Sequence, residues 1–159
     1  MTAGTDRVRQ DAERRSIPIE IVERPRADSL EHAAELLGIT PAEIVKSLVV
    51  KRSDGSYLFA LVPGDRQISW PKLRAVVGVN KLRMPEAELA LAATGYARGT
   101  ITPLGSSTAW PVFADERIVG KRVSMGSGKH GYSAWVHTDD LISGLNATVA
   151  DITIEGSTD

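Results

Sequence analysis

Hydrophobic and polar residues alternate over several short stretches of the chain, with the spacing of two that is typical of β-strands with one buried face. The clearest case is residues 132–137, where Tyr132, Ala134 and Val136 occupy alternate positions. Alternation or β-branched composition predicts further strands at 17–22, 46–52, 57–62, 110–113, 121–125 and 148–154. The Asp54-Gly55 pair predicts a tight hairpin between the second and third of these strands.

Helix-terminal signals lie between the strands. Asp28 with Glu31 and Thr40 with Glu43 have the spacing of N-terminal capping boxes. Further helices are predicted over 71–77, 85–93 and 139–145, the last one capped by Thr138. Strands interleaved with short helices predict an α+β fold: a single domain with a mixed, largely antiparallel, curved β-sheet or partial barrel surrounded by short helices.

The two ends of the chain differ from the part between them. Residues 1–16 form a polar arm that is either a short surface helix or frayed, and the tail 155–159 is expected to be frayed. No internal repeat or linker divides residues 17–154, so these are expected to form one domain.

Composition adds mainly exclusions. The 159 residues, 42% hydrophobic and 25% charged, suit one globular domain. Nineteen Lys and Arg nearly balance twenty Asp and Glu, giving a net charge of −1, so contact with nucleic acid is expected to be small and local. No apolar run is long enough to span a bilayer, and the polar start does not resemble a signal peptide. We therefore expect a cytoplasmic protein without a membrane partner.

Several catalytic chemistries find little support. The absence of cysteine removes disulfides, thiolate metal sites and a Cys nucleophile. His32, His130 and His137 lack paired metal-ligand spacing, so neither a metal nor another cofactor is expected. Ser127 lies between glycines but outside a GxSxG motif, which argues against a serine hydrolase.

The segment 126–131 matches GxGxxG literally. A dinucleotide-binding motif needs a helix directly after it, whereas a strand is predicted here. The glycines therefore predict a hairpin turn with Lys129 at its tip. Either the hairpin is a plain connection, or its backbone N–H groups bind an anion.

Three more features have both a structural and a functional interpretation. Lys46 shares a strand face with Leu48 and Val50, and it either extends to the rim or serves a site. The loop 95–105, with three glycines and a proline, is expected to be exposed, as an ordinary connector or as a cradle for an oxyanion or sugar hydroxyl. Asp115 is either a turn residue or a carboxylate offered at a strand end.

In this order, the segments resemble the YbaK family of aminoacyl-tRNA editing domains, related to the editing insert of bacterial prolyl-tRNA synthetase. The resemblance covers roughly residues 29–152. The segments that carry it are GITPAEIVKSLVV at 38–50, LVPGD at 61–65, the loop 95–105, PVFADE at 111–116, GSGKHG at 126–131 and the end 140–152.

The resemblance implies a free-standing hydrolase that removes the amino acid from mischarged tRNA, with Cys- or Ala-tRNA(Pro)-type molecules as substrates. It implies no metal, cofactor or covalent nucleophile: a positioned water attacks, or the substrate's own thiol in cysteine-specific members. Lys46 is the expected catalytic residue. The expected substrate-binding residues are Gly95, Tyr96, Gly99, Pro103, Gly105, Asp115, Gly126, Ser127, Gly128 and Lys129. The implied partners are the acceptor end of aminoacyl-tRNA and prolyl-tRNA synthetase or another synthetase; the oligomeric state is left open.

One position departs from the family pattern. Some cysteine-specific members have Ser-Gly-Gly-Lys where this chain has Gly126-Ser127-Gly128-Lys129, so a pocket for alanine, serine or threonine is equally open. Candidate cations for the acceptor end are Lys72, Arg74, Lys81, Arg83, Lys121, Arg122 and Lys129. The rival hypothesis is a non-catalytic module that binds tRNA, a nucleotide or a synthetase.

Overall fold

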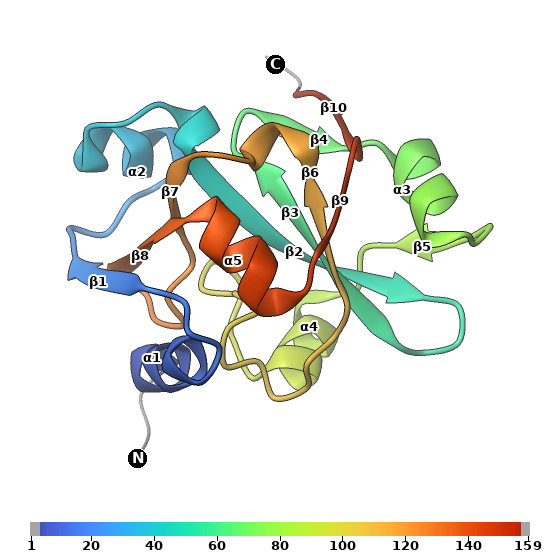
Figure 1. Ribbon diagram of the computed structural model, residues 1–159, viewed down its shortest axis with the longest axis horizontal. Coiled ribbons are helices and arrows are strands. Elements are labelled where there is room, and N and C mark those ends of the chain that lie inside the picture. The colour runs from blue at the N-terminus through green and yellow to red at the C-terminus, as the bar shows by residue number, and fades with distance from the viewer. Residues whose placement is uncertain (1–3, 157–159) are drawn as a thin grey trace.

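An antiparallel hairpin of two long strands, β2 (Ile44–Arg52) and β3 (Tyr57–Pro63), lies at the centre of the fold. The computed structural model describes residues 4–156. Other strands extend the hairpin into one mixed sheet in the order β1-β8-β7-β2-β3-β6-β9, with β5 pairing the far end of β2 (Figure 1). The pairs β2–β7, β3–β6 and β6–β9 are parallel, and the others in this sheet are antiparallel.

The predicted α+β class with a mixed sheet is confirmed, and the strand bounds differ at the ends. The remaining strands of the sheet are β1 (Ile19–Glu23), β5 (Leu82–Arg83), β6 (Val112–Asp115), β7 (Arg122–Met125), β8 (Tyr132–His137) and β9 (Thr148–Ala150). The strand predicted at 148–154 is in fact two. Its second half is β10 (Thr153–Glu155), which pairs with β4 (Arg66–Ile68) in a separate two-stranded sheet.

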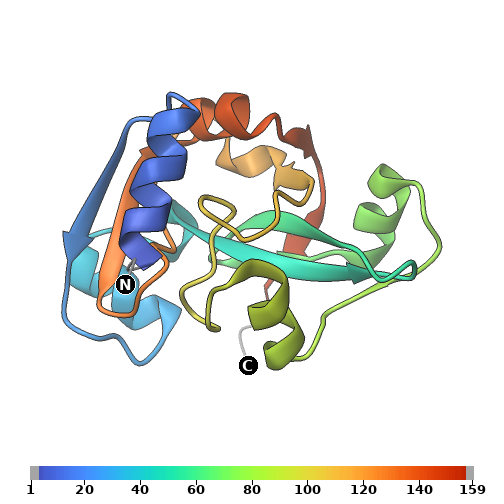
Figure 2. The same ribbon diagram turned by 90° about the horizontal axis from the view of Figure 1, so that it is seen from below.

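Short helices cover both faces of the sheet. They are α2 (Leu30–Leu37), α3 (Trp70–Val77), α4 (Ala87–Thr94) and α5 (Thr138–Leu145), with 3-10 turns η1 (Pro41–Glu43) and η2 (Glu116–Ile118). Figure 2 shows α5 and α4 on opposite sides of β2 and β3. Left-handed glycines end three helices, at Gly38, Gly78 and Gly95, because glycine adopts positive φ without steric cost.

Two predicted caps move by one residue. The Ser29 side chain, rather than Asp28, caps α2 by accepting the His32 N–H. The His137 ring, rather than Thr138, accepts the Asp139 N–H at the start of α5. In both cases a neighbouring polar side chain reaches the free N–H groups of the first turn equally well.

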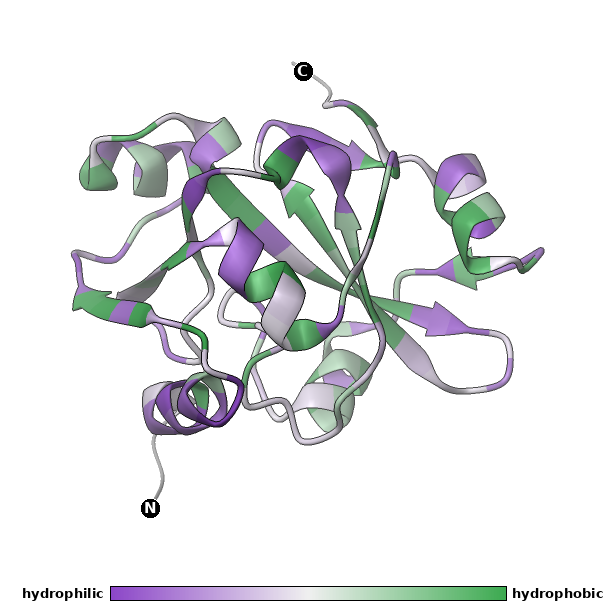
Figure 3. Cartoon of the chain, in the orientation of Figure 1, coloured by the Kyte–Doolittle hydropathy of each residue, from purple (hydrophilic) through white to green (hydrophobic). Residues whose placement is uncertain are grey.

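The apolar residues form one cluster on each side of the central hairpin. One cluster includes Val45, Val49 and Phe59, and the other includes Val50, Leu58 and Val62. Figure 3 shows hydrophobic residues concentrated along β2, β3 and β6. Because odd and even positions of β2 face opposite sides, the central strand contributes to both clusters.

The N-terminal arm is part of this core. Residues 4–14 form helix α1 (Gly4–Arg14), and its Val8 and Ala12 side chains are completely buried. Of the tail 155–159, which was expected to be frayed, Glu155 ends β10 and the Gly156 N–H donates to the Asp65 carbonyl. Residues 1–3 and 157–159 lie outside the described residues.

Candidate active site

A cleft of about 920 Å³ opens beside the middle of β2. At this point β2 is paired with β3 along one edge, and its other edge has no neighbouring strand among the described residues. On that second edge, β7 lies opposite Ile44 and Val45, and β5 lies opposite Lys51 and Arg52. Between these contacts no strand of the described residues covers the edge, so the cleft borders an open segment of the central strand.

The polar groups on this open edge can be assigned from the alternation of the ladder. The Ile44 carbonyl accepts from the Gly64 N–H, and the Arg52 N–H donates to the Ser56 carbonyl. Even-numbered residues of β2 therefore direct their backbone groups toward β3, and odd-numbered residues direct theirs away from it. Ser47 and Val49 thus present N–H and C=O groups to the cleft, and both residues line it.

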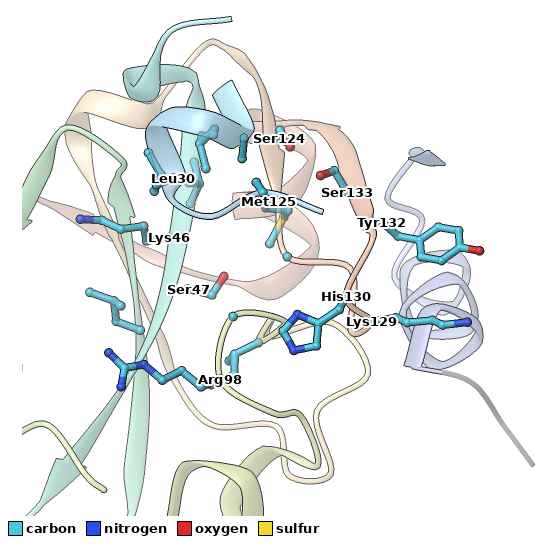
Figure 4. A pocket seen from close by; sticks show the side chains of 18 of the residues that line it. Leu30, Lys46, Ser47, Arg98, Ser124, Met125, Lys129, His130, Tyr132 and Ser133 are labelled. Carbon is cyan, nitrogen blue, oxygen red and sulfur yellow. The ribbon is translucent and has the colours of Figure 1, made fainter. Parts of the chain in front are cut away.

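Lys46 lies at the start of the open segment, on the opposite strand face from Ser47 (Figure 4). Its ammonium donates a hydrogen bond to the Arg66 carbonyl. Burial lowers the pKa of this ammonium below its usual value, while the carboxylates of Asp65 and Glu31 oppose part of that shift. Because the strand edge itself forms a wall of the cleft, residues from both strand faces border one cavity.

The charged residues that line the cleft are predominantly basic. The basic side chains are Arg24, Arg26, Lys46, Arg98 and Lys129, whereas the one carboxylate in the lining is that of Asp28. A chain of net charge −1 therefore places a local excess of positive charge around one cavity. Such an arrangement attracts a polyanion at a single point and not along a broad surface.

The loop 95–105 contributes to the cleft only through its middle. Arg98, Gly99 and Ile101 line the cavity. The expected residues Gly95, Tyr96, Pro103 and Gly105 lie elsewhere, and Pro103 borders a smaller, separate hollow. The expectation of an exposed loop holds for Gly95 and for residues 97–99, whereas Tyr96, Thr100 and residues 102–104 are buried. The expected free N–H groups are largely paired, as at Tyr96, Leu104 and Gly105.

Side chains of helix α1 form hydrogen bonds with backbone groups at the two ends of this loop. Arg7 donates to the carbonyls of Thr94, Gly95 and Gly105, and its guanidinium lies 4.6 Å from the centre of the Tyr96 ring. The Gly105 N–H donates to Asp11 at 2.8 Å. Burial alone would raise the pKa of the Asp11 carboxyl, but this N–H and the side chains of Arg14 and Arg15 hold it below its usual value.

The loop is further secured by its own tyrosine. The Tyr96 hydroxyl donates to the Leu104 carbonyl at 2.7 Å, and burial raises the pKa of Tyr96 to about 12. The ends of the loop are therefore closed on themselves and on α1, which leaves the middle residues to face the cleft.

The glycine turn 126–131 joins β7 to β8 as the predicted hairpin, with Gly126 and Lys129 lining the cleft. Ser127 is buried, and its hydroxyl donates within the turn to the carbonyls of Lys129 and Tyr132. The Gly128 N–H donates to the Thr100 carbonyl. Ser127 and Gly128 therefore connect the turn to itself and to the loop 95–105, and the cleft lining does not include them.

The departure at Gly126 has a steric cause. A Cβ atom at this position would collide with the Ile101 carbonyl oxygen. The backbone of the loop thus crosses directly over Gly126, and a serine side chain does not fit there unless the loop moves.

Asp115 lies away from the cleft. It is completely buried, pairs with Arg117 at 3.1 Å, and accepts the Ile152 N–H. Arg117 also pairs with Asp151 at 2.8 Å, and Lys72 pairs with the same carboxylate at 2.9 Å. These bonds join β6 to the segment before β10 and support the structural interpretation of Asp115.

Sequence reasoning missed several residues that line the cleft. Of the seven suggested cations, Lys129 alone is among the lining residues, whereas Arg24, Arg26 and Arg98 were not proposed. Ser47 was also missed, although it directly follows Lys46. Only the folded structure singles out Ser47, because its hydroxyl is buried and has no hydrogen-bond partner among the described residues.

Residues 4–156 contain neither a metal-binding cluster nor a membrane-spanning helix. No three His, Cys, Asp or Glu side chains gather closely enough to hold a metal ion. No helix in this range is long and apolar enough to cross a bilayer.

The fold, with a basic cleft beside an open strand edge, is that of a known family. Residues 24–143 match the aminoacyl-tRNA editing domain, and the chain belongs to this family. A solved structure titled "Crystal structure of a putative trans-editing enzyme for prolyl tRNA synthetase" superimposes with a TM-score of 0.87 at 28% identity, covering 99% of each chain.

Two curated relatives are similar over different shares of their length. "Putative Cys-tRNA(Pro)/Cys-tRNA(Cys) deacylase EbsC" of Enterococcus faecalis (strain ATCC 700802 / V583) is 30% identical over 126 residues, covering 79% of this chain and 77% of the relative. The proline–tRNA ligase of Thermosipho africanus (strain TCF52B) is 42% identical over 88 residues, or 55% of this chain. The matched part is 16% of that ligase, so the similarity covers only one region of the ligase.

Proposed function

We propose that this protein is an aminoacyl-tRNA deacylase that acts in trans on mischarged tRNA, with the cleft beside β2 as its active site. The observation that carries the proposal is the coincidence of Lys46, open backbone donors and a local basic lining at one cavity. Family membership and the names of the related proteins support the same activity.

Each part of the cleft has a role in this reaction. The basic lining attracts the phosphates of the acceptor end, where the aminoacyl ester is attached. Lys46 and nearby backbone N–H groups stabilise the oxyanion that forms when the ester is attacked. Exclusion of bulk water by the cleft strengthens these interactions.

The reaction itself is a hydrolysis. The oxygen of a positioned water forms a bond to the ester carbonyl carbon, and the bond from that carbon to the ribose oxygen breaks. A proton from the water passes to the ribose oxygen, so the products are the free amino acid and a tRNA with an intact terminal hydroxyl. Catalysis then rests on positioning and electrostatic stabilisation.

The test is a panel of tRNAs mischarged with Cys, Ala, Ser and Thr, with release of the amino acid followed for wild type and two variants. Lys46→Ala is expected to slow release about a hundredfold, since removal of one oxyanion-stabilising group costs this much. Lys51→Ala is the matched control: it lies on the same strand, outside the cleft lining, opposite Arg83 of β5. It should leave the rate unchanged.

The panel also separates the proposal from a binding module. Release that depends on Lys46, with unchanged thermal unfolding of the variant, supports a deacylase. Binding of tRNA without release, even after addition of prolyl-tRNA synthetase, would replace it with the non-catalytic module.

A further inference from the structure

On the open edge of β2, Ser47 has three hydrogen-bonding groups without a partner among the described residues: its N–H, its C=O and its hydroxyl. Ser47 presents its N–H and its C=O to the cleft, since neither β7 nor β5 reaches it. Its hydroxyl oxygen is buried without a partner, a condition shared among the described residues with Ser106 alone. An unpaired buried polar atom is costly, and Ser47, unlike Ser106, belongs to the wall of the cleft.

We propose that the aminoacyl group of the substrate pairs with the Ser47 backbone in the way that one residue of a neighbouring antiparallel strand would. The side chain of that aminoacyl group then lies against the Ser47 hydroxyl. This subsite favours small amino acids that carry a hydroxyl or thiol, such as serine or cysteine, over alanine. The inference rests on the proposed function and adds to it the chemistry of the group that is recognised.

The geometry follows from the antiparallel ladder. Two residues of a hydrogen-bonded pair exchange both of their N–H···O bonds. The α-ammonium of the aminoacyl group thus donates to the Ser47 carbonyl, and the Ser47 N–H donates to the ester carbonyl oxygen. That oxygen becomes the oxyanion when water attacks, so this N–H acts as one of the stabilising donors.

The same pairing places the substrate side chain. Side chains of directly opposed residues lie on the same face of a sheet, with Cβ atoms about 5 Å apart. On the Ser47 face this position is bordered by Val45, Met125 and Ile101, all of which line the cleft. Figure 4 shows the Ser47 hydroxyl directed toward the space between Met125 and His130. A hydroxyl within an apolar wall selects for a polar atom on a small side chain.

Binding of hydrolysis-resistant analogues tests the subsite independently of turnover. The probes are 3′-amino-3′-deoxyadenosine carrying serine or alanine in amide linkage, titrated by calorimetry. Wild type should bind the seryl probe about tenfold more tightly, the effect of one hydrogen bond to an otherwise unpaired group. Ser47→Ala should remove this preference. Ser106→Ala, which deletes the other unpartnered hydroxyl outside the cleft, should retain it.

A second variant tests the backbone donor. Proline at position 47 removes an N–H that makes no bond in the β2–β3 ladder, so Ser47→Pro is compatible with the strand. It should lower the deacylation rate about a hundredfold, beyond the effect of Ser47→Ala. Thermal unfolding of both variants shows whether the fold is retained. If Ser47→Pro does not fold, the Ser47→Ala binding result decides.

The outcomes separate the two proposals. A Ser47-dependent preference for the seryl probe without any release of amino acid would support the subsite and overturn the deacylase. Release by wild type with a seryl-to-alanyl ratio that Ser47→Ala leaves unchanged would overturn the subsite and support the deacylase. Failure to bind either probe would also overturn the subsite.

Discussion

The open segment of β2 and the loop 95–105 both border the cleft, yet they use their polar groups in opposite ways. At Ser47 and Val49 the strand leaves backbone donors and acceptors without partners. The loop, although rich in glycine, directs its terminal polar groups to α1 and to Tyr96. The regular β-strand thus leaves backbone N–H and C=O groups free, whereas the glycine-rich loop has its terminal polar groups hydrogen-bonded.

This difference has a physical cause in the long-range contacts of each segment. The strand loses its neighbour because β7 and β5 contact only the two ends of β2. The loop gains partners because α1, about ninety residues earlier in the chain, supplies Arg7 and Asp11. Unsatisfied polar groups in the folded state, more than glycine content, indicate where a ligand binds.

The largest effect is expected from opening the closed loop. Gly105 has a φ of 72°, and a Cβ there would lie 2.5 Å from the Tyr96 hydroxyl and 2.8 Å from the Arg7 backbone. Gly105→Ala should therefore lower the free energy of unfolding by about 3 kcal/mol, from strain and overpacking together. Chemical denaturation measures this change.

Gly38→Ala is the matched control for that substitution. Gly38 also has a φ of 72°, but nothing lies within 4 Å of its added Cβ. The expected cost is about 1 kcal/mol, from backbone strain alone. Equal costs at the two positions would show that the loop is not packed against α1 as described.

A smaller effect is expected where the loop crosses the glycine turn. In Gly126→Ser the new side chain meets the Ile101 carbonyl, so the loop must move. We expect a loss of about 2 kcal/mol of stability, together with a raised KM for deacylation, because Ile101 lines the cleft. Gly120→Ser is the control: its added Cβ meets nothing within 4 Å and the residue lies outside the cleft lining. It should cost only about 1 kcal/mol of stability, from its left-handed backbone, and leave KM unchanged. A stable Gly126→Ser with unchanged KM would contradict the crossing.

The smallest effect concerns the ion pairs of Asp151, which precedes β10. Strand β10 pairs with β4, whose Arg66 carbonyl accepts from Lys46. Hydrogen bonds from Arg117 and Lys72 lower the pKa of Asp151 to about 2. Because the folded pKa lies below the unfolded value of 3.8, this stabilisation is present above pH 4 and is lost as the pH falls toward 2. Melting temperatures across this window should fall less steeply for Asp151→Asn than for wild type. Parallel curves would argue against the network.

The sequence predicted local features well. The strand at 132–137 and the helix ends at Gly38 and Gly78 depend on neighbouring residues, and the structure confirms them. The two- and three-residue strands β4, β5 and β10 were missed or misplaced, since they are too short to show a period and form only by pairing with distant segments.

The candidate site was predicted only in part for the same reason. Lys46 was singled out because a lysine on an apolar strand face is unusual in sequence, and the family resemblance made it the expected catalytic residue. Ser47 was missed because a serine in a strand is ordinary until the neighbouring strands diverge from it. The closure of the loop around Tyr96 was missed because it depends on Arg7 and Asp11, whose positions next to the loop no local pattern indicates.

The most direct test of the account is an amide NMR titration of ¹⁵N-labelled protein with the seryl 3′-amino-3′-deoxyadenosine probe. The account predicts that the Ser47 and Val49 amides exchange rapidly with solvent in the free protein. On binding, the Ser47 resonance should shift most and become protected, while the Gly105 amide, bonded to Asp11, stays unchanged. A titration that shifts Gly105 and its loop but leaves Ser47 unaffected would contradict the assignment of the open strand edge as the substrate-binding element.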